Sequence, residues 1–320
     1  MENINHVTIF GLHLTINKVA FKLPMFGGWE IRWYGIIIAI GFLLALLYAY
    51  KYAKRFNIDI NRAIDVVIVT VPVAIICARM YYLIFDSTEP FRLSDFLPTD
   101  GGFSGLAIYG GVIGAFACGA LMCYLRKVNI LDMFDLAAMG FLIGQGVGRW
   151  GNFTNQEAFG APTGSKFFGM TSESVVSDFI RQGYDSNALA HPCFLYESIW
   201  CIAGFFIIHK LSAKRRFSGE TFLMYGAWYG FGRAIIEGFR TDSLMLGNLR
   251  VSQLLSVLLC LTCAALLVIL RKKFALSIND SSYVPMITAD DETDVEEAYE
   301  ETTDIETREE ITEAENEQDN

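Results

Sequence analysis

The sequence predicts an all-α membrane protein with seven transmembrane helices, the N-terminus outside, the C-terminus inside and a small extracytoplasmic cap. The chain of 320 residues is 53% hydrophobic and 14% aromatic, and its mean hydropathy is +0.36. Soluble domains of this length are normally less apolar. Several apolar runs also approach the ~20 residues that span ~30 Å of hydrocarbon. A polytopic membrane protein with no nucleic-acid partner is therefore expected.

The charge of the loops predicts the orientation. Cytoplasmic loops carry an excess of Lys and Arg. Here the basic loops are KYAKRF after the first run, RK at 126–127, KLSAKRR at 210–216 and RKK at 271–273. They alternate with longer loops of mixed charge, which we assign to the outside. The seven expected spans are approximately 33–50, 63–85, 104–125, 131–147, 194–211, 219–237 and 251–270.

Three regions follow from these spans. Residues 1–32 are expected to form an outer interfacial segment, and they lack the basic start and small-residue cleavage site of a signal peptide. Residues 33–272 are expected to form the seven-helix transmembrane core, in which the longest outer loop, 148–193, supplies the cap. Residues 273–320 are strongly acidic with few large apolar side chains, which predicts a disordered cytoplasmic tail.

The seven cysteines predict neither disulfides nor a metal centre. Nearly all of them lie inside apolar runs, where a thiol behaves as a small hydrophobic group. Cys260 and Cys263 form a CxxC pair, but no histidine or second pair lies near them in the sequence.

Ionisable residues inside the spans are the main functional signal, because they are costly in lipid and usually face a cavity or a partner. Tyr229, Arg233 and Glu237 recur every fourth residue and share one helical face. A simple Arg–Glu pair is one explanation. The other is an anion site in which Arg149 and Arg233, from different spans, bind a phosphate through their planar guanidinium forks. Further charges at the outer ends of spans are Arg79, Glu197 and Arg240.

The run GRWGNFTNQEAFG, Gly148 to Gly160, follows the fourth span directly. It resembles the signature of bacterial prolipoprotein diacylglyceryl transferases, G-R-x-G-N-F-x-N-x-E-x-x-G, at every fixed position. The blocks RWYGI, YGGVIG, HPCFLYE and YGFGRAIIEGFR resemble the same family and occur in the same order. The resemblance covers about residues 20–272.

The resemblance implies the first step of bacterial lipoprotein maturation, in a multi-pass protein of the cell membrane with its site toward the outer face. The sn-1,2-diacylglyceryl group of phosphatidylglycerol passes to the lipobox cysteine of a preprolipoprotein, forming a thioether and releasing glycerol phosphate. No metal or other cofactor is implied. The catalytic residues expected from the resemblance are Arg149, Arg233, Tyr109 and Glu237. Those expected to bind phosphatidylglycerol are Tyr34, Arg149, Asn152, Asn155, Glu157, Gly160, Tyr229 and Arg233.

One position departs from the family pattern. Many members have a histidine before the paired glycines of the third span, where this chain has Tyr109. A phenol is a poor base at neutral pH unless a nearby cation assists it. His191 is a second outer-side candidate, although such a histidine often has only a local packing role. The sequence therefore assigns no general base.

Three other functions have weaker support. The GFSGLA segment matches the serine motif of intramembrane proteases at Ser104, but the last two spans contain no histidine and His209 lies at an inner end. A transporter is disfavoured because no broken helices or inverted repeat are evident. A lipid-alcohol phosphatidyltransferase requires an Asp-rich metal motif, which Asp132 and Asp135 alone do not make.

Overall fold

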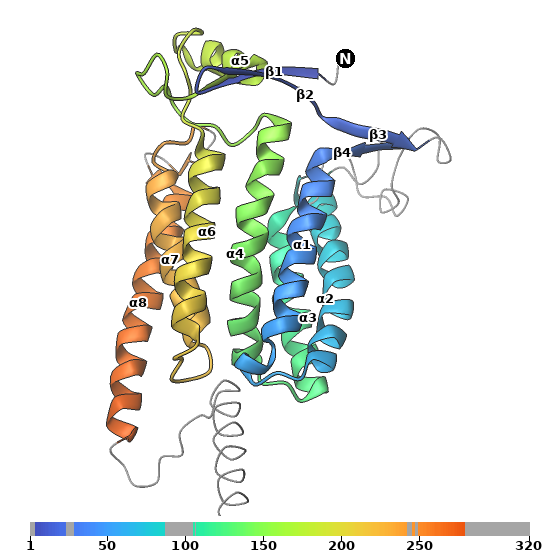
Figure 1. The fold of residues 1–320 in the computed structure, drawn as a ribbon, viewed down its shortest axis with the longest axis vertical. Helices are drawn as coiled ribbons and strands as arrows, with labels where there is room; N and C mark the ends of the chain where they lie inside the picture. Colours follow the sequence, from blue (N-terminus) through green and yellow to red (C-terminus); the bar gives the residue numbers. More distant parts are fainter. Residues whose placement is uncertain are drawn as a thin grey trace, which may run out of the picture.

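The computed structural model describes residues 4–23, 29–86, 105, 107–241, 245–246 and 249–278. The expectations for Ser104 and for most of the acidic tail lie outside these ranges. The described chain is mostly helical, and its long helices run side by side below a small cap (Figure 1). The long helices are α1 (Trp33–Tyr52), α2 (Ile60–Tyr81), α3 (Ile108–Arg126), α4 (Ile130–Asn155), α6 (Cys193–Ser212), α7 (Glu220–Ile236) and α8 (Val251–Ile278).

Each of the seven expected spans overlaps one of these helices, although α4 runs well past the expected end of the fourth span. Within the described residues, six helices are long and apolar enough to cross a membrane. The remaining one, α7, has 17 residues. A short π-helical turn, η3 (Tyr82–Asp86), continues α2, and a 3-10 turn, η2 (Lys54–Phe56), follows α1.

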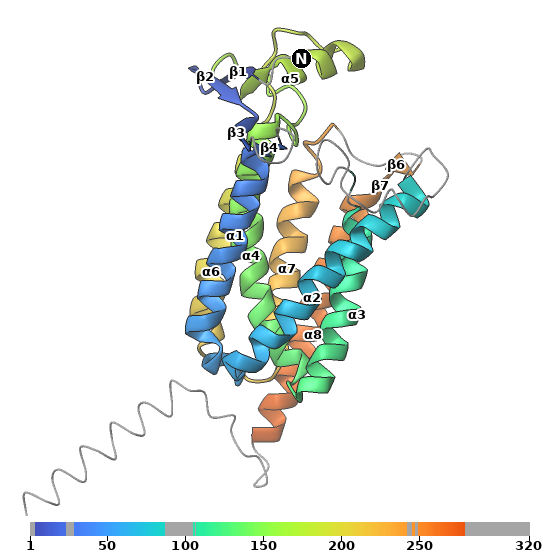
Figure 2. The same cartoon turned by 90° about the vertical axis from the view of Figure 1, so that its right-hand side faces the viewer.

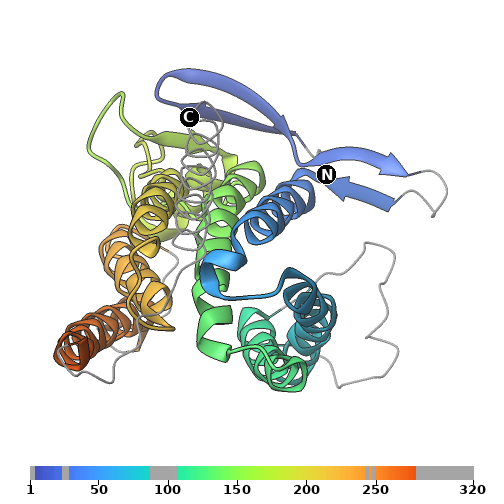
Figure 3. The same cartoon turned by 60° about the horizontal axis from the view of Figure 1, so that its bottom comes forward.

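Helix α4 occupies the middle of the bundle. It packs against α1 on one side and against α6 and α7 on the other. Helices α2 and α3 form a pair that stands beside α1, and α8 packs against α7 (Figures 2 and 3). The buried core runs along α4 through Leu136, Met139 and Leu142. Most of the outward surface of the helices is apolar, as for Leu47 and Leu261, which fits a lipid environment better than water.

The N-terminal segment contains strands that we did not expect. Strand β1 (Ile4–Ile9) pairs with β2 (Leu12–Asn17) around a two-residue turn in which Phe10 and Gly11 both have positive φ, as tight hairpins require. Strand β1 also pairs with β5 (Met170–Ser172), so this hairpin belongs to the cap. Strands β3 (Val19–Leu23) and β4 (Trp29–Arg32) form a second hairpin that leads into α1.

The cap also contains helix α5 (Glu173–Gln182), which lies above the bundle with β1 and β2 (Figure 1). The Ser172 hydroxyl accepts from the Val175 N–H at its start, and Gly183 ends it with φ 78°. A two-stranded element, β6 (Met245–Leu246) with β7 (Leu249–Arg250), precedes α8.

The expectation that Gly148 opens a loop was wrong. Helix α4 continues through Arg149 and Asn152 and ends at Asn155. The side chains of Arg149 and Asn152 are hydrogen-bonded to other side chains of the protein, as described below. They therefore do not compete for the backbone N–H and C=O groups, which keep their helical hydrogen bonds. Gln156 then ends the helix in the left-handed conformation, φ 60°.

A buried polar network lies at the end of the bundle away from the cap. Arg215, in the loop between α6 and α7, contacts Asp132 at 2.7 Å and Asp135 at 2.9 Å. Asp135 also accepts the Gly219 and Phe222 backbone N–H groups, at 2.8 and 2.7 Å. Asp135 thus joins α4 directly to the start of α7, and both aspartates hold the loop between α6 and α7 through Arg215.

Candidate active site

Three arginines and two glutamates meet at the cap end of the bundle. Glu197 lies in the second turn of α6, and Arg149 comes from the end of α4. Arg233 lies in the last turn of α7, and Glu237 and Arg240 follow it. Both carboxylate side chains are almost fully buried.

Glu197 is the shared partner of the arginines. Its Oε2 lies 2.5 Å from Arg149 Nη2, and its Oε1 accepts from Arg233 Nη1. Arg240 Nη1 approaches the same Oε1 at 3.4 Å. Arg233 also contacts Glu237 through Nη2 at 2.6 Å, the expected i,i+4 pair. The simple Arg–Glu pair thus exists, but Arg233 reaches two carboxylates, and one of them binds Arg149 as well.

The accessible part of this cluster is cationic. The side chains of Arg149 and Arg233 keep 20% and 16% of their surface exposed, whereas those of Glu197 and Glu237 keep 3% and 2%. An incoming anion can therefore contact the two guanidiniums while the carboxylates stay behind them. Because Glu197 binds one guanidinium on each of its oxygens, it holds both in fixed positions before a ligand arrives.

A chain of amides continues the cluster into the segment that follows α4. Arg149 Nη1 donates to Asn152 Oδ1 at 3.2 Å, and Asn152 Nδ2 donates to Glu157 Oε1 at 3.0 Å. Asn155 Nδ2 approaches the same Glu157 oxygen at 3.3 Å. Four expected site residues of the signature, all except Gly160, are thus joined in one network that fixes the orientation of Arg149.

The two expected tyrosines of the binding set lie beside the arginines. Tyr34, in the first turn of α1, packs on α4 at Gly151, where an added Cβ would lie 2.8 Å from its ring. Tyr229, on α7, stacks on Tyr225 with 5.8 Å between ring centroids. The Tyr225 hydroxyl in turn accepts from Gln145 of α4 at 2.9 Å.

Gly160 sits where the cap joins α6 and the segment after α7. Its N–H donates to the His191 carbonyl at 2.8 Å, and an added Cβ would lie 2.5 Å from the Phe239 carbonyl oxygen. Another residue here would force apart the chains that carry Glu197 and Arg240. His191 itself is paired through Nδ1 with the Tyr196 hydroxyl at 3.0 Å, and burial lowers its pKa. These contacts hold the imidazole in the cap, mostly in its neutral form at neutral pH.

A reciprocal pair of tryptophans sets the register of α6 against α7. Trp200 Nε1 donates to the Trp228 carbonyl at 2.9 Å, and Trp228 Nε1 donates to the Trp200 carbonyl at 3.0 Å. The two indoles stack with 4.4 Å between centroids. Each indole lies over a glycine of the other helix, Gly204 or Gly232. Because Trp200 is one turn from Glu197 and Gly232 adjoins Arg233, this pair fixes where the carboxylate meets the guanidinium.

Tyr109 lies apart from the cluster in the described contacts. It is in the first turn of α3, 56% exposed, with its ring 6.3 Å from that of Tyr81 on α2. Arg79, buried on the same helix pair, donates to the Gly105 carbonyl at 2.9 Å and faces the Tyr82 ring. The structure thus brings together every expected site residue except Tyr109, whose catalytic role stays a prediction.

The chain matches the family model described as prolipoprotein diacylglyceryl transferase over residues 18–269. It belongs to this family. Among curated relatives, the phosphatidylglycerol–prolipoprotein diacylglyceryl transferase of Clostridium novyi (strain NT) is 45% identical over 244 residues, 76% of this chain and 91% of the relative. The enzymes of the same name from Limosilactobacillus reuteri (strain DSM 20016) and Bacillus cereus (strain B4264) are 40% and 39% identical over 82% and 80% of this chain, and 94% and 93% of the relatives. The resemblance drawn from the signature is confirmed.

The ion pairs of the site also show one residue that sequence reasoning left out. Glu197 was noted as a charge near the start of a span but was absent from the expected site residues, although it contacts all three arginines. The available signal was a carboxylate at the start of an apolar run, as the last residue of HPCFLYE, one of the blocks that carried the resemblance to the transferase family. His209, by contrast, pairs with Tyr48 at 2.9 Å within the bundle.

Proposed function

We propose that this protein is a multi-pass enzyme of the bacterial cell membrane that transfers the sn-1,2-diacylglyceryl group of phosphatidylglycerol to the lipobox cysteine of a prolipoprotein. The family match over residues 18–269 and the names of the relatives support the reaction and both substrates. The convergence of Arg149 and Arg233 on Glu197 is the observation that carries the mechanism.

In the proposed reaction, the cysteine sulfur attacks C3 of the glyceryl group, a C–S bond forms, and the C–O bond to the phosphate breaks. The thiol loses its proton, and glycerol phosphate leaves as the second product. Negative charge moves from the sulfur to the departing phosphate oxygens. Arg149 and Arg233 bind those oxygens from two helices, and preorganised cations at this point lower the barrier.

The remaining site residues have positioning roles in this proposal. Asn152, Asn155 and Glu157 orient Arg149 through their hydrogen bonds. Glu237 and Glu197 hold Arg233, and Tyr34 and Tyr229 line the approach of the lipid. Gly160 keeps the cap close to the arginines.

The proposed topology has seven membrane spans, with α7 as the shortest, and puts the cap outside. The end of the bundle opposite the cap holds the basic residues at 126–127, 210–216 and 271–273, which supports a cytoplasmic position for that end. The arginine cluster then faces the outer leaflet. A membrane-impermeant thiol reagent tests this in whole cells. It should label Lys166→Cys in the cap and leave Lys214→Cys, between α6 and α7, unlabelled, and the reverse pattern would invert the topology.

The reaction is tested with the full chain in vesicles that contain phosphatidylglycerol labelled in the glycerol carbons of its diacylglyceryl group. A lipobox peptide should acquire the label and keep it after mild alkali, which removes the ester-linked acyl chains and leaves the thioether intact, while the Cys→Ser peptide should not acquire it. Absence of transfer to the cysteine peptide from vesicles that hold correctly inserted protein would refute the proposed function.

A further inference from the structure

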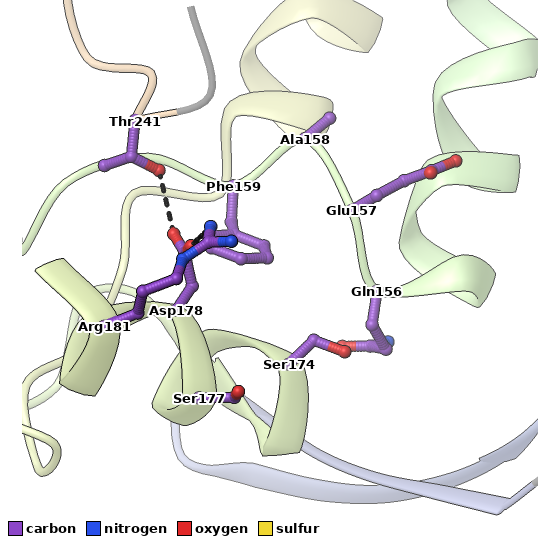
Figure 4. Close-up of a pocket in the computed structure, with 9 residues that line it drawn as sticks. All are labelled: Gln156, Glu157, Ala158, Phe159, Ser174, Ser177, Asp178, Arg181 and Thr241. Carbon is purple, nitrogen blue, oxygen red and sulfur yellow. Dashed lines mark hydrogen bonds and ion pairs between the residues drawn. The ribbon is translucent and has the colours of Figure 1, made fainter. Parts of the chain in front are cut away.

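An open cavity of about 420 Å³ with a mixed polar and apolar lining lies in the cap (Figure 4). One wall is the chain segment 156–159, directly after α4. The other wall is the face of α5 that carries Ser174 and Ser177. Figure 4 shows the Gln156 side chain directed toward the α5 wall, while Glu157 turns the other way, toward α4. Segment 156–159 therefore divides the cavity from the arginine network.

Gln156 carries a hydrogen-bond acceptor that the described protein does not satisfy. The residue is 3% exposed, and its Nε2 donates to the Phe153 carbonyl at 2.5 Å. Its Oε1 is buried and has no hydrogen-bond partner among the described residues. Leaving such an oxygen unpaired is costly and uncommon in native proteins. A ligand that supplies an N–H or O–H donor to Gln156 Oε1 would remove this cost.

The charges around the cavity disfavour an ionic ligand. The carboxylate of Asp178 is paired with Arg181 and accepts from Gln182 at 2.7 Å and Thr241 at 3.4 Å. Arg181 is thus neutralised within the wall and is a weak phosphate ligand. The hydroxyls of Ser174 and Ser177 have no partner in the described part of the chain, and they offer neutral donors and acceptors. This combination suits the backbone of an extended polypeptide.

The position of the cavity indicates which polypeptide would bind there. In the proposed function, on which this inference rests, the acceptor cysteine reacts beside Arg149 and Arg233, and the chain that follows the cysteine leaves the membrane toward the cap. Glu157 lines the cavity and is linked to Arg149 through Asn152. An extended chain covers ~3.3–3.6 Å per residue, so a few residues past the cysteine reach the cavity.

We propose that the cap cavity is a binding site for the prolipoprotein segment that directly follows the acceptor cysteine. Gln156 Oε1 accepts a backbone N–H of that segment, and the serine hydroxyls of α5 bind its polar groups. The cavity increases affinity for the acceptor and takes no part in bond making or breaking.

The test compares two acceptor peptides with the full-length enzyme in phosphatidylglycerol vesicles. One peptide ends in an amide directly after the lipobox cysteine, and the other continues for several residues. The wild type should have a KM about five- to tenfold lower for the longer peptide, the gain from one or two hydrogen bonds. Ser177→Trp, which fills the cavity from an exposed position on α5, should remove this preference, and Gln156→Leu should do the same. Ile180→Trp, on the same helix but away from the cavity, is the matched control and should retain the preference.

Each other outcome overturns the inference. Equal KM values for both peptides with the wild type, or an undiminished preference in Ser177→Trp, would show that the cavity does not bind the acceptor. A loss of kcat that is equal for both peptides in Ser177→Trp, with the difference in KM retained, would also overturn it, because the substitution would then disturb the fold without affecting acceptor binding. A raised KM for phosphatidylglycerol with unchanged acceptor values would assign the cavity to the glycerol of the donor lipid. Failure of the wild type to modify either peptide would refute the proposed function itself, which is distinguishable from all of these results.

Discussion

Replacing Gly232 by alanine tests whether the tryptophan pair positions the arginine cluster. An added Cβ at Gly232 would lie 2.1 Å from Trp200 Nε1, and ordinary contact begins at 3.4 Å, so the indole or its helix must move by about 1.3 Å. The indole cannot simply rotate away, because it donates to the Trp228 carbonyl and stacks on the Trp228 ring. The displacement therefore passes to α6, on which Glu197 lies one turn away.

A misplacement of about 1 Å at a reacting centre can cost ~10²-fold in rate. We expect Gly232→Ala to lose about that much of its transfer rate from labelled phosphatidylglycerol to a lipobox peptide, with a smaller effect on stability, about 1–3 kcal/mol for overpacking. The matched control is Gly119→Ala on α3, where the nearest atom would lie 3.7 Å from the new Cβ; its rate should stay near that of the wild type.

A second variant separates positioning from general damage. Trp200→Phe in the Gly232→Ala background removes the part of the indole that meets the new methyl group, so part of the lost rate should return. Both proteins should be compared at equal amounts of inserted, folded enzyme. If Gly232→Ala is as active as Gly119→Ala, the tryptophan pair does not set the catalytic geometry and the reasoning fails.

Four further predictions use the same transfer assay. Arg149→Lys keeps the charge but loses the planar fork, so activity should be severely reduced; near-normal transfer would show that Arg149 does not bind phosphate bidentately. The double variant Arg233→Met with Glu237→Gln should insert normally yet remain inactive, with a loss of ~10²–10³ in rate, whereas restored activity would reduce this face to a structural ion pair. Tyr109→Phe should keep measurable activity, because the ring lies apart from the cluster; a loss as complete as that of Arg149→Ala would make the phenol essential. Truncation after Lys273 should leave transfer intact, and an inactive but correctly inserted truncation would assign the acidic tail a role in catalysis.

Local sequence patterns failed at two places, for identifiable reasons. The polar residues Arg149 and Asn152 suggested that the fourth span ends at 147, yet they continue α4 because each is paired inside the fold. The strands of residues 4–32 were missed because they are short, and because the edge strand β2 is largely exposed. Strand β1 gains its third partner, β5, from a segment far along the chain, and no local pattern encodes such a pairing.

The sequence by itself determined the long apolar runs, the basic segments between them and the signature from Gly148 to Gly160. Apolar length and loop charge are properties of contiguous residues, so they can be read without the fold. Only the tertiary structure decided that Glu197 joins Arg149 to Arg233 and that Trp200 and Trp228 set the register between α6 and α7. These contacts join residues on different helices, and whether two such side chains meet depends on how closely the helices approach. Glycines at the crossing points set that distance, and their effect appears only when the helices are packed together.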